Sequence, residues 1–115
     1  MEMARAATTA DVFNAVAEPR RRAILELIAS TELPVGELVR RTGFGQPQVS
    51  KHLRVLREVE AVLVRERGRE RLYRVNGPAL RPIGEWVKSF EHLWNERFDA
   101  LEQVLVEINE REDER

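Results

Sequence analysis

The chain has 115 residues, of which 43% are apolar and 34% charged, enough for one domain with a modest core that a partner subunit would help to stabilise. It has no cysteine, which excludes disulfides and thiolate metal sites. No apolar run approaches the roughly 20 residues of a membrane span, so we expect a soluble cytoplasmic protein with no membrane partner. The net charge of −1 conceals a basic segment between acidic ends, residues 40–74, whose ten Lys and Arg against four Glu favour a polyanionic partner.

The start of the chain has the apolar spacing of three short helices. We expect the first over residues 9–17. The second opens at Pro19, which a first helical turn tolerates, and ends by Glu32. Pro34 starts a third helix, over about residues 35–42.

A tight turn, Gly43-Phe44-Gly45, leads into a fourth helix over residues 46–59. Residues 34–57 thus have the order of a helix-turn-helix, in which the second helix enters the DNA major groove and its N-terminal residues reach base edges. Gln can pair with adenine, and Lys or Arg with guanine. An exposed polar helix face is the structural alternative. The candidate base-reading residues are Gln46, Gln48, Ser50, Lys51 and Arg54.

The period then changes to that of two strands, over residues 61–67 and 69–75. If Arg67-Gly68 forms a two-residue turn between them, Val62 lies opposite Tyr73. The two segments therefore predict a β-hairpin.

This hairpin is rich in arginine. Arg-rich strands can be a solvated edge that prevents aggregation, but the hairpin has more arginines than that purpose requires. Those at the tip, Arg67 and Arg69, are best placed for phosphate or minor-groove contact. The candidate DNA contacts of the hairpin are Arg65, Arg67, Arg69 and Arg71.

A long helix is predicted over residues 79–108, with apolar side chains at steps of three and four. Its apolar face is wider than one small domain can cover, so we expect a homodimer. An alternative is a small-ligand pocket beside Trp86, Phe90 and Trp94, although aromatics at this spacing are more often core or interface. The candidate interface residues in this helix are Phe90, Trp94, Phe98 and Leu101.

Much of the chain resembles the ArsR/SmtB family of bacterial winged-helix repressors. The matching segments are AVAEPRRRAILELIA (15–29), VGELVRRTGFGQPQVSKHLRVLREV (35–59) and GRERLYRV (68–75). The most specific piece is the run VSKHL within the second segment. The segment EWVKSFEHLWNERFDALEQVL (85–105) resembles the metal-independent branch often encoded beside START-like (SRPBCC) proteins.

The resemblance implies a dimer built by the first and last helices, with two recognition helices in successive major grooves. It adds Val12 and Phe13 to the expected dimer interface. It also adds His52 to the recognition helix, where we expect this residue to orient the helix against the core or against a DNA phosphate.

Two positions depart from the family pattern. Gly45 stands where the family usually has Ser or Thr capping the recognition helix, and glycine is a weaker cap. Glu60 stands where the family often has Gly, so we expect backbone strain if this position needs a positive φ.

Metal sensing and catalysis are both disfavoured. The helix at 35–42 has no cysteine and the last helix has one histidine, His92, so we predict no metal and no cofactor. Ser50 and His52 are two residues apart on a helix, so their side chains diverge, and we predict no enzyme.

These observations predict a single mostly helical α+β domain over residues 1–115. We expect a winged helix-turn-helix with four helices, a β-hairpin wing and a long C-terminal dimerisation helix at 79–108. The expected function is a homodimeric repressor that binds double-stranded DNA at a palindromic operator. The alternative is a winged-helix protein-interaction module without specific DNA binding; the polar face of the fourth helix and the basic hairpin favour DNA. The sequence names neither the operator nor an inducer.

Overall fold

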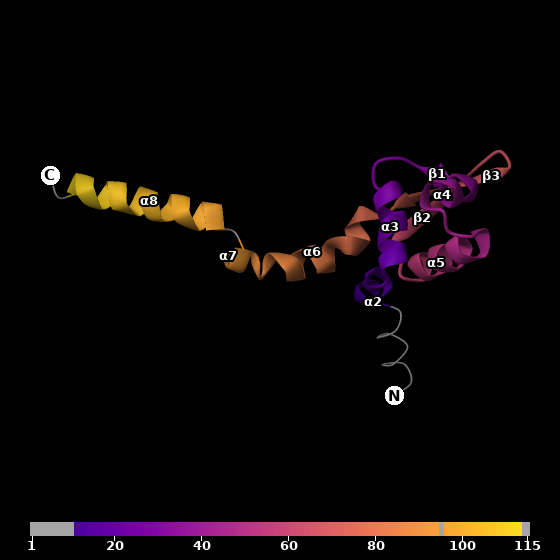
Figure 1. The fold of residues 1–115 in the computed structure, drawn as a ribbon, viewed down its shortest axis with the longest axis horizontal. Helices are drawn as coiled ribbons and strands as arrows, with labels where there is room; N and C mark the ends of the chain where they lie inside the picture. Colours follow the sequence, from indigo (N-terminus) through magenta and orange to yellow (C-terminus); the bar gives the residue numbers. More distant parts are fainter. Residues whose placement is uncertain (1–10, 95, 114–115) are drawn as a thin grey trace, which may run out of the picture. The chain divides into compact units, whose positions relative to one another are not determined.

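The computed structural model describes residues 11–94 and 96–113, without the side chains of 96–100 (Figure 1). The chain divides into two units, and the boundary between them falls after Ile83. Within the described residues, no helix is long and apolar enough to cross a lipid bilayer.

The first unit opens with two short helices, α2 (Val12–Ala17) and α3 (Pro19–Leu27). The Asp11 carboxylate caps α2 by accepting a hydrogen bond of 2.7 Å from the Asn14 N–H. Glu18 caps α3 in the same way, and the proline that follows it occupies the first turn as expected. Thr9 and Ala10, which the predicted first helix included, lie outside the described residues.

The helix-turn-helix consists of α4 (Val35–Thr42) and α5 (Gln46–Glu58), close to the predicted bounds. Gly43 ends α4 in the left-handed conformation, with φ of 76°, and its N–H donates to the Val39 carbonyl at 2.9 Å. This turn positions α5.

A second left-handed residue ends α5. Glu60 has φ of 61° and is the one non-glycine residue with positive φ in the described part of the chain. Its N–H donates to the Arg57 carbonyl, and the Ala61 N–H donates to the Leu56 carbonyl, both at 2.9 Å, which is the Schellman arrangement. The Asn76 side chain donates to the Glu60 carbonyl at 2.8 Å. The positive φ that was the condition for strain at this glutamate is therefore present.

The sheet has three antiparallel strands in the order β1-β3-β2, formed by β1 (Leu33–Pro34), β2 (Val62–Arg67) and β3 (Glu70–Val75). Strands β2 and β3 form the predicted hairpin. Strand β1 was not predicted from the sequence, because two residues are too short to show a strand period. Leu33 lies opposite Tyr73, so β1 attaches the hairpin to the residues just before α4.

The predicted hairpin register is wrong, because the turn lies one residue further along the chain than predicted. The turn residues are Gly68 and Arg69, and Val62 lies opposite Val75 rather than Tyr73. Gly68 takes φ of 62°, which glycine adopts at little cost at the first position of such a turn. The resulting shift is two residues, so the same side chains still share a face.

The core lies where α3, α4 and α5 pack together with the inner face of the hairpin. Ile24, Leu38 and Leu56 are fully buried. The buried cluster consists of Ala15, Ile24, Leu25, Ile28, Leu33, Leu38, Val49, Leu53, Leu56, Ala61, Val62 and Tyr73.

The single long helix predicted over 79–108 is not continuous in the structure. Its place is taken by a 3₁₀ turn, η1 (Gly77–Leu80), and by α6 (Arg81–Lys88), α7 (Glu91–Trp94) and α8 (Glu96–Asp113).

Ser89 explains the break between α6 and α7. Its hydroxyl donates to the Trp86 carbonyl at 2.6 Å, and its N–H is shared between the carbonyls of Glu85 and Trp86 at 3.2 Å each. The Phe90 N–H donates to the Val87 carbonyl, three residues back, at 3.0 Å. A serine that bonds nearby backbone competes with the helical ladder, and apolar spacing does not reveal this competition.

Candidate nucleic-acid interface

The polar face of α5 is exposed along its N-terminal half. Val49 and Leu53 bury the opposite side of the helix in the core. Gly45 is the N-cap residue and makes no side-chain cap, as its lack of a hydroxyl predicts. The predicted base-reading residues on the exposed face are Gln46, Gln48, Ser50, Lys51 and Arg54.

His52 does not share that face. Its side chain is 7% exposed, and its buried Nδ1 has no hydrogen-bond partner among the residues that the structure describes. Burial lowers the pKa of the imidazole, and the cationic Arg21 lowers it further. Of the two roles expected for His52, this burial favours orienting α5 against the core over contacting a phosphate.

Two arginines at the base of the hairpin are paired with an acid. The Nε atom of Arg65 lies 2.9 and 2.7 Å from the two carboxylate oxygens of Glu32, and a guanidinium nitrogen of Arg74 lies 3.6 Å away. The hydrogen bond from Arg65 lowers the pKa of the Glu32 carboxyl. Arg65, one of the predicted DNA contacts, is thus held against the residues that precede β1.

Glu37 pairs the two arginines of α4. Its carboxylate lies 2.8 Å from Arg40 and 3.0 Å from Arg41, and these hydrogen bonds lower its pKa to about 2. Four of the ten cations of residues 40–74 therefore have a carboxylate partner.

The other six cations have no ion pair with any described residue, and all six are exposed. Three belong to α5 and three to the distal half of the hairpin. A duplex could reach these six without displacing an acid: Lys51, Arg54, Arg57, Arg67, Arg69 and Arg71.

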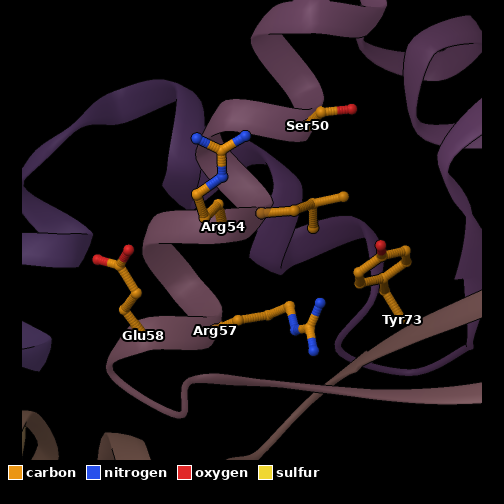
Figure 2. A pocket seen from close by; sticks show the side chains of 6 residues that line it. Ser50, Arg54, Arg57, Glu58 and Tyr73 are labelled. Carbon is orange, nitrogen blue, oxygen red and sulfur yellow. The ribbon is translucent and has the colours of Figure 1, made fainter.

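A hollow of about 390 Å³ lies between α5 and β3 (Figure 2). It brings Ser50 and Arg54 together with Arg57 and Tyr73, two residues that were not among the candidates predicted from the sequence. Arg57 follows Ser50 and Arg54 at helical spacing, a signal that could have found it. Tyr73 comes from the hairpin, and only the packing of the hairpin against α5 reveals its position.

Exposed apolar side chains are present in both units. In the first unit Phe13 is exposed and Val12 is half-buried. In the second unit three predicted interface residues, Phe90, Trp94 and Leu101, are exposed. The Phe98 side chain lies outside the described residues. Further exposed apolar residues of this unit are Trp86, Val87, Leu93, Val104, Leu105, Val106 and Ile108.

The described residues bring together no group of three or more His, Cys, Asp or Glu side chains that could hold a metal ion.

Comparison with known proteins gives one consistent result. Residues 18–62 match the family model of bacterial regulatory proteins of the arsR family. An HTH-type transcriptional regulator of Mycobacterium tuberculosis is 40% identical over 93 residues, which are 81% of this chain and 84% of the relative. The transcriptional repressor SdpR of Bacillus subtilis is 28% identical over 80 residues, which are 70% of this chain and 89% of that protein.

A solved structure shares the same architecture. It is a homodimeric winged helix-turn-helix DNA-binding domain from Mycobacterium bovis, described as a possible ArsR-family transcriptional regulator. It is 29% identical, with a TM-score of 0.63, and the match covers 82% of this chain and 89% of that one.

Proposed function

Because this chain belongs to the arsR family of bacterial regulatory proteins, we propose that it is a homodimeric transcriptional repressor that binds double-stranded DNA in the cytoplasm. The observation that carries the proposal is the set of six exposed cations on α5 and the hairpin that form no ion pair with any described residue. They lie on the two elements that a winged helix presents to DNA. The two relatives named above are a transcriptional regulator and a transcriptional repressor.

In this proposal, the N-terminal half of α5 enters the major groove. The glutamines at its start, Gln46 and Gln48, can each pair with adenine, and Lys51 or Arg54 can pair with guanine. The tip of the hairpin, with Arg67 and Arg69, contacts phosphates or the adjacent minor groove. His52 positions α5 from within the core.

Dimerisation supplies the second reading helix. The exposed apolar side chains of the second unit, together with Val12 and Phe13 of α2, form contacts between subunits. The homodimeric relative from Mycobacterium bovis supports this assembly. A two-fold dimer requires matching half-sites about one helical turn apart, or a multiple of it, so we propose a palindromic operator.

Selection of bound duplexes from a random DNA pool tests this function. The wild type should enrich an inverted repeat. A variant with Gln46, Gln48 and Lys51 all changed to Ala should lose preference at particular bases, since each bidentate contact is worth about 1–3 kcal/mol. A protein-interaction module would enrich no sequence and would show no salt-dependent DNA binding, and this result would reject the proposal.

A further inference from the structure

The space between α5 and the hairpin is where a bound duplex must place one of its backbones. In B-DNA one phosphodiester strand separates the major groove from the neighbouring minor groove. If α5 occupies the major groove and the hairpin tip approaches the minor groove, that strand crosses the gap between the two elements. The hollow of about 390 Å³ lies in this gap.

Three groups face the hollow with donors that suit a phosphate. Figure 2 shows the Arg57 side chain extending toward Tyr73, with the Ser50 hydroxyl and the tyrosine hydroxyl on the same side of α5. The arginine supplies a full positive charge, and the two hydroxyls supply O–H donors. Arg54 and Glu58 also line the hollow. In this view Glu58 extends to the side of α5 away from Tyr73, and the Arg54 side chain lies over the helix.

These donors are available, and the tyrosine among them is held by the core. Among the described residues, neither the Arg57 guanidinium nor the hydroxyls of Ser50 and Tyr73 have a hydrogen-bond or ion-pair partner. Tyr73 is only 7% exposed, because its ring belongs to the core, and Leu53, 2% exposed, forms the apolar floor beside it. A buried ring that presents its hydroxyl to an open hollow places that donor with little loss of side-chain entropy.

We propose that this hollow is a subsite for one backbone phosphodiester of the operator in each half-site. Arg57 provides the charge, and the hydroxyls of Ser50 and Tyr73 donate hydrogen bonds to the phosphate oxygens. The subsite rests on the proposed DNA binding and adds two residues, Arg57 and Tyr73, to it. It fixes the position of the duplex between α5 and the hairpin and carries no base preference of its own.

Two variants should give different signatures when binding to the selected operator is measured across a salt series. Arg57→Gln should lower the magnitude of the salt slope by about 1.8 units per dimer, because two phosphate contacts each release about 0.9 counterion. Tyr73→Phe keeps the ring and the core but removes a neutral donor, so it should weaken binding by about tenfold without changing the slope. Arg81→Gln, an equal loss of charge at the start of α6, is the control.

Neutral methylphosphonate groups placed one at a time along the operator identify the phosphate. In each half-site, the neutral group at one particular position should weaken operator binding by the wild type. The same substitution should not weaken binding by Arg57→Gln any further. An unchanged salt slope for Arg57→Gln, or a response of Arg57 and Tyr73 variants to different phosphates, would overturn the subsite while leaving DNA binding intact. If the wild type shows no salt-dependent binding to any duplex, the proposed function itself fails. Thermal unfolding of each variant verifies that the fold is retained.

Discussion

Glu60 holds a backbone conformation that glycine adopts more easily. Its φ of 61° lies in the left-handed region, where a β-carbon is crowded, yet the Schellman bonds and the Asn76 amide fix this conformation. The residue therefore stores strain at the point where α5 turns into the hairpin.

Glu60→Gly should relieve that strain. We expect a gain in the free energy of unfolding of about 0.5–1 kcal/mol, since relief of the left-handed conformation exceeds the extra unfolded-state entropy of glycine. Glu58→Gly, two residues earlier in the helix, should instead cost about 0.5–1 kcal/mol. Urea denaturation measures both variants. Equal destabilisation by the two glycines would show that position 60 is unstrained.

His52 should make stability depend on pH. The folded pKa is lowered by burial and by nearby cations, so the unfolded chain binds the proton more readily. The stabilisation is complete above the unfolded value of about 6.5 and decreases as the pH falls below it toward the folded pKa. The charged groups that act on the imidazole are Arg21, Glu18, Lys51 and Arg20.

Thermal unfolding between pH 7 and pH 5 tests this expectation with the two histidines of the chain. The wild type and His92→Gln should both lose stability over this range, because the exposed His92 lies outside the core. His52→Gln should lose less. Parallel curves for all three proteins would remove His52 as the source.

At the scale of elements, the ion pairs divide the hairpin into an anchored base and a free tip. Glu32 holds Arg65 and Arg74 at the base, whereas Arg67 and Arg69 form no ion pair with a described residue. A cation already paired with a carboxylate contributes less to phosphate binding than a free one.

Two double variants separate the base from the tip. Arg67→Ala with Arg69→Ala should lower the salt slope of operator binding by up to about 3.6 units per dimer, from four lost contacts. Arg65→Ala with Arg74→Ala removes the same formal charge but should change the slope much less, because the Glu32 carboxylate already engages both guanidinium groups. Fluorescence anisotropy of labelled operator at several salt concentrations gives both slopes. Equal slopes for the two variants would contradict this division of the hairpin.

The elements that the sequence predicted well are those whose signal is local. The glycine turn and the polar and apolar faces define α4 and α5, so their bounds agree with the structure. Strand β1 exists only through its pairing with β3, and the hairpin register depends on which turn position Gly68 takes. Neither follows from periodicity.

In the candidate site too, the features with a local sequence signal were predicted and the tertiary contacts were not. The exposed face of α5 follows from helical spacing, but the burial of His52 and the pairing of Arg65 with Glu32 are tertiary contacts. From the sequence, Tyr73 is placed only as a strand residue opposite Val62. Its burial in the core and its position beside Arg57 at the hollow are tertiary features.

At the scale of the whole molecule, the exposed apolar side chains of the second unit predict assembly. Trp94 is 55% exposed and Leu101 is 54% exposed, and exposed groups of this size on one segment are typical of an interface. Trp94→Glu should therefore give monomers or aggregates at concentrations where the wild type sediments as a dimer. Lys88→Glu, which adds a carboxylate on an exposed polar position of the same unit, should remain dimeric. A folded wild-type monomer at high concentration in sedimentation equilibrium would contradict the prediction.

The uneven distribution of charge along the chain has a consequence for how the purified protein behaves on chromatographic media. Its sequence pI is about 6.2, yet six exposed cations on α5 and the hairpin have no ion pair with any described residue, and residues 85–115 hold ten acids against four Lys and Arg. Chromatographic media respond to local patches of charge more than to the total. At neutral pH and low salt the same preparation should be retained both by heparin and by an anion exchanger. At very low ionic strength, molecules of this protein should associate with one another, the basic surface of one contacting the acidic segment of another. Modest salt should reverse this association.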